Sequence, residues 1–135
     1  MPPFTHHRRI AFYETDAGGI VHFSNYLRFA EEAELQALLS LGLAAYPSPY
    51  MLPRVHVEAD YHLPLHFNDE IAVEAILDRI GNSSLHWRFD IRRSGDHCAQ
   101  VRIVTVRTGK EEENGGFAVV PYTEEEREKF RTLLA

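Results

Sequence analysis

The sequence predicts an α+β fold in which one long helix is followed by an antiparallel sheet. Residues 24–41 carry apolar side chains at intervals of three and four, which is the spacing of a helix with one buried face. Four later runs, at about 54–63, 70–80, 84–94 and 97–108, alternate polar and apolar residues with a period of two. This order of elements indicates a sheet packed on a single helix, although it also permits other α+β arrangements.

Length and composition indicate one globular domain, which we expect to span residues 1–135. Hydrophobic residues make up 44% of the chain and charged residues 25%, so the chain can bury an ordinary core. The formal net charge of −6 argues against non-specific binding to nucleic acid or to anionic membranes.

The sequence carries no sign of membrane insertion or export. No apolar run approaches the roughly 20 residues of a transmembrane helix, and residues 1–9 lack the apolar segment of a signal peptide. Cys98 is the single cysteine, so it cannot form an internal disulfide and is expected to be a small core residue. We therefore expect a cytoplasmic protein.

The long helix has recognisable end signals. Residues 6–13 are predicted to form a first strand, with Ile10 and Phe12 on one face. Ser24 is a suitable N-cap for the helix that follows, and Gly42 is a suitable residue just past its end. The solvent face of this helix is predicted to carry Arg28, Glu31, Glu32, Glu34 and Gln36.

In each predicted strand polar and apolar residues alternate, and this alternation predicts which side chains face the core and which face solvent. In the run at 54–63 the predicted inward residues are Val55, Val57, Ala59 and Tyr61, and the predicted outward ones are Arg54, His56, Glu58 and Asp60. Asn68-Asp69, Gly81-Asn82 and residues 94–96 supply hairpin turns between the strands.

The remaining segments are connections and a C-terminal helix. Residues 43–53 contain three prolines and are predicted to be a loop. A polar loop at 110–116 leads to a short predicted strand at 117–120. Thr123 and Glu126 have the spacing of a capping box, which predicts a helix start there.

The stretch Y-E-T-D-A-G-G-I-V-H-F-S-N-Y, residues 13–26, carries the most functional information. It places the carboxylate of Asp16 on a bend just before the N-terminus of the long helix. Free backbone N–H groups and the positive end of the helix dipole can stabilise a developing oxyanion there. The residues alone also fit an Asx-turn at Asp16, with Gly18 and Gly19 relieving strain.

This stretch resembles the signature of the hotdog-fold acyl-CoA thioesterases, specifically the group of 4-hydroxybenzoyl-CoA thioesterase and the tol-pal-associated thioesterase. The matching residues are Asp16, Gly19, Ile20, Val21, Asn25 and Tyr26. The likeness continues through Y-H-L-P-L-H-F-N-D-E at 61–70 and G-N-S-S at 81–84, so it covers most of the chain. It implies a hotdog fold, in which the antiparallel sheet wraps around one central helix.

The resemblance implies hydrolysis of an acyl-CoA thioester with an aromatic or short-chain acyl group, and it implies no cofactor. It places Asp16 at the catalytic aspartate of the family. Such a carboxylate is ionised at neutral pH and can attack the thioester or take a proton from water. Phe23 corresponds to the position whose backbone N–H polarises the thioester carbonyl in the family.

Three further residues are candidates for the site. His22 and Phe23 depart from the residue order common in the family, so the imidazole of His22 could point to another face. Tyr26 is expected to pack in the core, although its hydroxyl could reach the site. Glu58 could face the pocket of a neighbouring subunit, as similar strand residues do in some hotdog proteins.

Other chemistries lack their motifs. His56 and His62 share a strand face, but no H-E-x-x-H or Cys-His spacing accompanies them, so we expect no metal. No G-x-S-x-G supports serine chemistry. Arg79 and Arg88 lie near the turn where some relatives hold CoA phosphates, and an acyl-carrier protein is an alternative carrier of the acyl group.

Two rival functions and the assembly complete the expectations. A hotdog hydratase or dehydratase acts on acyl thioesters without hydrolysis, and a non-catalytic module would only bind them. A sheet that covers its helix on one side leaves the site open, so we expect a homodimer or homotetramer.

Overall fold

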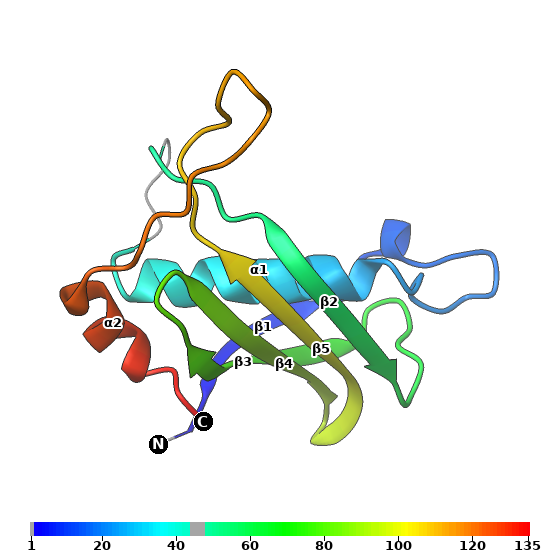
Figure 1. The fold of residues 1–135 in the computed structure, drawn as a ribbon. Helices are drawn as coiled ribbons and strands as arrows, with labels where there is room; N and C mark the ends of the chain where they lie inside the picture. Colours follow the sequence, from blue (N-terminus) through cyan, green and yellow to red (C-terminus); the bar gives the residue numbers. More distant parts are fainter. Residues whose placement is uncertain (1, 44–47) are drawn as a thin grey trace.

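The computed structural model describes residues 2–43 and 48–135, in which five antiparallel strands and two α-helices follow one another as predicted (Figure 1). The elements are β1 (Phe4–Arg9), α1 (Asn25–Ser40), β2 (Arg54–Tyr61), β3 (Glu70–Ile80), β4 (Ser84–Arg93), β5 (Asp96–Val106) and α2 (Glu124–Arg131). A short 3-10 turn, Phe12–Glu14, lies between β1 and α1. The spatial order of the strands is β1-β3-β4-β5-β2, so β1 and β2 are the edges.

The core lies between α1 and one face of the sheet. The helix buries Phe29, Ala30, Ala33 and Ala37, and the three alanines let the sheet approach closely. Alternate residues of the central strands face the helix, including Val73, Trp87, Phe89 and Val101. The α+β prediction is confirmed.

The ends of α1 follow the predicted signals only in part. Gly42 has a φ of +73°, and the N–H of Leu43 donates to the carbonyl of Leu38, which closes the helix as predicted. Ser24 occupies the N-cap position, but its side chain makes no capping hydrogen bond. Its hydroxyl lies 2.7 Å from Nδ1 of His22 instead.

Two of the predicted strands are different in the structure. The first strand ends at Arg9, and exposed Phe12 begins the 3-10 turn because Glu14 bonds back to Ala11 through both its backbone N–H and its carboxylate. The strand predicted at 117–120 is reduced to a single bridge between Val119 and Thr108. Within the predicted loop at 43–53, Pro47 lies outside the described residues.

Two charged side chains that were predicted to face solvent point inward. A bulge between Arg54 and His56 shifts the alternation of β2, so Arg54 pairs with Thr105 on the side that faces α1. Glu34 is only 1% exposed, because it lies four residues from both Ala30 and Leu38, which are core positions of α1. The guanidinium of Arg54 bonds to the carboxylate of Glu34.

Buried Arg107 fastens α2 to the end of β5. Its guanidinium lies between the rings of Tyr50 and Tyr122, at 4.2 and 4.4 Å from their centroids, and donates to Glu126 at 2.6 Å. Burial opposes ionisation of Glu126, but hydrogen bonds from Arg107 and Thr123 outweigh it and lower its pKa. The predicted capping box is confirmed, since Thr123 and Glu126 exchange two hydrogen bonds.

We expect Arg107→Lys to lower the free energy of unfolding by about 1–3 kcal/mol. Lysine keeps the charge but loses the planar fork and the stacking between two rings. Urea unfolding followed by circular dichroism measures the change. Arg102→Lys on the exposed outer face is the matched control, expected within about 0.5 kcal/mol of the parent. Equal urea midpoints for the two variants would show that the stacking and hydrogen bonds of Arg107 contribute nothing to stability.

Candidate functional site

Asp16 lies on a tight bend between the 3-10 turn and α1. Its backbone N–H donates to the carbonyl of Ile20 at 2.9 Å, and its carbonyl accepts from Gly19 at 3.0 Å. Its Oδ1 accepts from the N–H of Gly18 at 2.8 Å, which is the predicted Asx-turn. Gly19 has a φ of +81°, a conformation that favours glycine. The carboxylate is exposed, and its Oδ2 bonds to none of the described residues.

Glu14 anchors both sides of this bend. Its carbonyl accepts from the N–H of His22 at 3.0 Å and from Nδ2 of Asn25 at 2.7 Å. Its buried carboxylate pairs with Arg8, whose guanidinium also lies 4.5 Å from the ring centre of Phe29. The bend is therefore tied to β1 and to the first turn of α1.

Phe23 presents an unused backbone donor at the entrance to α1. Its ring is exposed, and its N–H takes part in none of the hydrogen bonds formed within the described residues. Its carbonyl accepts from the hydroxyl of Tyr61 on β2 at 2.9 Å. That bond holds the peptide that follows Phe23, and the free N–H of Phe23 itself lies just before the helix N-terminus, where it can be offered to a ligand.

The ring of His22 lies beside Phe23, with centroids 4.6 Å apart. Its Nδ1 accepts from the N–H of Ser24 at 3.3 Å, so a neutral ring carries its proton on Nε2. The structure therefore brings His22 to the helix entrance but commits one of its nitrogens to Ser24.

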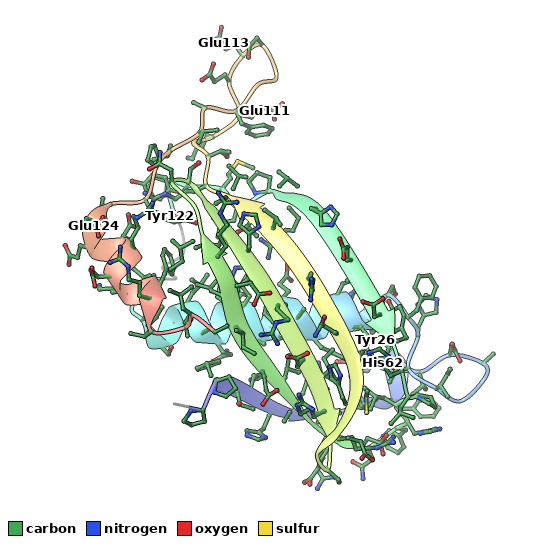
Figure 2. All side chains as sticks on the ribbon, turned by 60° about the horizontal axis from the view of Figure 1, so that its bottom comes forward. Tyr26, His62, Glu111, Glu113, Tyr122 and Glu124 are labelled. Atoms are coloured by element: carbon green, nitrogen blue, oxygen red, sulfur yellow. The ribbon has the colours of Figure 1, made fainter. Side chains whose placement is uncertain are left out.

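Tyr26 packs in the core, as predicted. Its ring is buried and meets Tyr61 edge-on, with centroids 4.9 Å apart. Burial raises the pKa of its hydroxyl, which is therefore neutral at physiological pH. Figure 2 shows Tyr26 at the same end of the sheet as His62, which directly follows β2.

Glu58 lies apart from this group. It is opposite Arg102 on the outer face of β2, and its carboxylate is 2.7 Å from Nε2 of His56. A role for Glu58 stays a prediction. Of the two arginines considered for CoA phosphates, Arg88 pairs with Asp78 and Asp90, whereas Arg79 forms no ion pair in the described part of the chain.

Among residues 2–43 and 48–135, no group of three or more His, Cys, Asp or Glu side chains is placed to hold a metal. The same residues contain no helix long and apolar enough to cross a membrane.

Three residues that position the site were missed in the sequence. Arg8 and Glu14 act through bonds that join β1, the 3-10 turn and α1, and Tyr61 bonds to Phe23 from 38 residues further along the chain. Glu14 and Tyr61 lie within the motifs at 13–26 and 61–70, but nothing in the neighbouring sequence assigns them a role. Only the folded chain shows what they bond to.

A sequence profile described as "Thioesterase superfamily" matches residues 18–100, which is more than half of the chain. The chain belongs to the thioesterase superfamily. A 1,4-dihydroxy-2-naphthoyl-CoA hydrolase from Prochlorococcus marinus is 33% identical over 107 residues, covering 71% of this chain and 69% of that protein. The predicted family is therefore confirmed.

Solved structures of thioesterases share the fold of this superfamily member. A 1,4-dihydroxy-2-naphthoyl-CoA thioesterase from Synechocystis superposes with a TM-score of 0.84 at 21% identity, covering 96% of each chain. The dynemicin thioesterase superposes with a TM-score of 0.88 at 23% identity, covering 98% of each chain. At these identities the likeness shows the fold, which is the predicted hotdog arrangement.

Proposed function

We propose that this member of the thioesterase superfamily hydrolyses the thioester bond of an acyl-CoA at the bend before α1. One observation carries the proposal: a single short segment presents the exposed carboxylate of Asp16 and the unused N–H of Phe23. The family to which the chain belongs, and the CoA thioester hydrolase named among its relatives, support it.

The two groups have complementary tasks. The N–H of Phe23 polarises the thioester carbonyl and stabilises the oxyanion that forms on it. Asp16 either attacks the carbonyl carbon to form an anhydride, which water then opens, or takes a proton from the attacking water. In both routes the C–S bond breaks, CoA leaves as the thiol, and a carboxylic acid is released.

A thiol-release assay over a panel of acyl-CoAs tests this function. The panel contains hydroxylated aromatic acyl groups, of the kind that the relative's name indicates, together with aliphatic chains. We expect one equivalent of free thiol for each equivalent of acid. Hydration without free thiol would identify a hydratase, and binding without either product would identify a non-catalytic module. Repeating the panel on acyl-carrier protein identifies the carrier.

We also infer a cytoplasmic homodimer or homotetramer. β2 is an edge strand, and no described residue pairs with its outer edge. Its exposed apolar side chains include Val55 and Val57, and it ends at Tyr61, which contacts Phe23. An open apolar edge next to the site suits a second copy of the chain.

We expect Val55→Lys to weaken both association and hydrolysis, because it places a charge at this edge. Light scattering at the assay concentration measures the mass, and the thiol assay measures the activity. Val119→Lys is the matched control, since Val119 is as exposed as Val55 but lies in the loop before α2. A monomeric parent protein with full activity would contradict the inference.

A further inference from the structure

The loop that joins β2 to β3, residues 62–69, bonds to both limbs of the bend that we propose to be catalytic. On the limb before the bend, the N–H of Ile10 donates to the carbonyl of Asp69 at 3.0 Å. On the limb after it, the N–H of Val21 donates to the carbonyl of Leu65 at 2.8 Å. We call this loop the supporting loop, and Figure 1 shows it beside the bend at one end of α1.

Further contacts join the supporting loop to the bend. The ring of Phe67 meets that of Phe12 edge-on, with centroids 5.7 Å apart. Ile20 forms an antiparallel bridge with His66. Leu65 is fully buried in the core, so the loop cannot shift without disturbing its packing. The position of the bend therefore depends on the conformation of this loop.

One carboxylate, that of Asp69, closes the supporting loop and fastens it to the sheet. Its Oδ2 accepts from the backbone N–H of His66 at 2.8 Å and from the guanidinium of Arg93 at 3.0 Å. Arg93, the last residue of β4, also donates to the carbonyl of Pro64 at 3.0 Å. Burial opposes ionisation of Asp69, but the hydrogen bonds from His66 and Arg93 outweigh it and lower the pKa of the carboxyl group. The carboxylate is therefore charged at neutral pH.

These bonds form one path from the sheet to the two groups that we assign to the reaction. β4 is the middle strand of the sheet, and Arg93 at its end holds the supporting loop. The loop holds Val21, which lies between the two groups in the chain. On one side the N–H of Asp16 donates to the carbonyl of Ile20 at 2.9 Å, and on the other Phe23 follows two residues after Val21. This short segment therefore fixes the separation of the Asp16 carboxylate from the Phe23 N–H.

We propose that Asp69 and Arg93 are positioning residues for hydrolysis, because they hold the supporting loop against the bend. Through the loop they keep the carboxylate of Asp16 and the N–H of Phe23 at their working separation, and neither acts on the thioester itself. The inference rests on the proposed function and adds two residues outside the motif at 13–26. A displacement of about 1 Å can cost on the order of 100-fold in rate, whereas a partly exposed ion pair contributes little to stability. The effect of losing them therefore falls on catalysis more than on folding.

Arg93→Ala removes both bonds that fasten the supporting loop to β4. We expect kcat for acyl-CoA hydrolysis to fall about 10- to 100-fold. KM should stay within about threefold of the parent value, because the displaced groups act on the reacting carbonyl and not on the rest of the ligand. Asp69→Asn should give a smaller loss of kcat, since its amide oxygen can still accept from the N–H of His66. Arg92→Ala is the matched control, because the neighbouring Arg92 pairs with Glu74 at 2.8 Å instead of with the loop, and its kcat should equal that of the parent.

Amide hydrogen exchange tests the hold of the loop on the bend without any substrate. The N–H of Val21 is protected by its bond to Leu65. On the full chain, NMR should show that this amide exchanges about 10-fold faster or more in Arg93→Ala than in the parent, because a freed loop opens more often. The amide of Phe89, in the middle of β4, should exchange as in the parent, which shows that the sheet is intact. Arg92→Ala should leave both amides unchanged.

The outcomes separate this inference from the proposed function. Parental kcat in Arg93→Ala, or unchanged exchange at Val21, would overturn the positioning role, while thiol release by the parent protein would leave the thioesterase function standing. Faster exchange at Val21 together with a fall in kcat that spares KM would support the role. If the parent releases thiol from no acyl-CoA, the proposed function fails, and exchange at Val21 alone decides whether Asp69 and Arg93 hold the bend. Should Arg93→Ala fail to fold, the same two measurements on Asp69→Asn decide.

Discussion

Asp16→Asn is expected to lower kcat for acyl-CoA hydrolysis by about 100-fold or more while the fold is retained. Asparagine keeps the oxygen that accepts from the N–H of Gly18, so the bend can form as before. It removes the negative charge and the basicity, which both proposed routes need. The thiol-release assay gives kcat, and thermal unfolding reports the fold.

Asp96→Asn is a suitable control for this experiment, because Asp96 is an exposed aspartate in the β4–β5 turn and has no part in the proposed chemistry. Its kcat should equal that of the parent. Parental kcat in a folded Asp16→Asn protein would remove Asp16 from the mechanism. A single turnover in heavy-oxygen water then separates the two routes, because direct attack by water labels the acid product, whereas an anhydride can transfer the label to Asp16.

Proline at position 23 should lower kcat by about 10²–10³, the usual cost of losing one oxyanion donor. Proline has no backbone N–H, so it deletes the group to which we assign the thioester carbonyl. Phe23→Leu keeps that N–H and is expected to lose little activity, because the exposed ring has no part in the chemistry. Comparing kcat for the two variants isolates the amide from the side chain.

Proline also restricts the residue before it, so the fold must be checked independently. Far-ultraviolet circular dichroism and the mass in solution should match those of Phe23→Leu. A ligand-bound structure gives the direct answer. A thioester carbonyl more than about 4 Å from every N–H in residues 19–26 lies beyond hydrogen-bonding distance, and it would refute the assignment even if Asp16 proved essential.

Local sequence was sufficient for the parts of the fold that local physics determines. The apolar spacing of α1, the positive φ at Gly42 and the capping box at Thr123 each depend on a few neighbouring residues. Asp16 and Phe23 were recognisable for the same reason, since both belong to one short motif. The residues around them could not be recognised in this way, because Tyr61 reaches Phe23 from β2, which lies far along the chain.

Glu34 and Arg54 depart furthest from their predicted positions. Each was predicted to face solvent because it is charged. For Arg54 there was a second reason, since strict alternation along β2 puts it on the other face of the strand from Val57. The bulge in β2 breaks that alternation, and no residue type announces it. Two charges that each seem unsuited to a core can be buried when they meet there, and a single sequence does not show that they meet.

Among the described residues β2 pairs only with β5, yet it supplies Tyr61 to the bend that we propose to be catalytic and Arg54 to Glu34 on α1. Edge strands with one neighbour detach at lower free energy than central ones. Detachment would release the carbonyl of Phe23 and the carboxylate of Glu34 together, while α1 stayed packed on β1, β3 and β5. We therefore expect loss of activity and loss of the fold to be separable events, so that a heated sample becomes inactive before it is denatured.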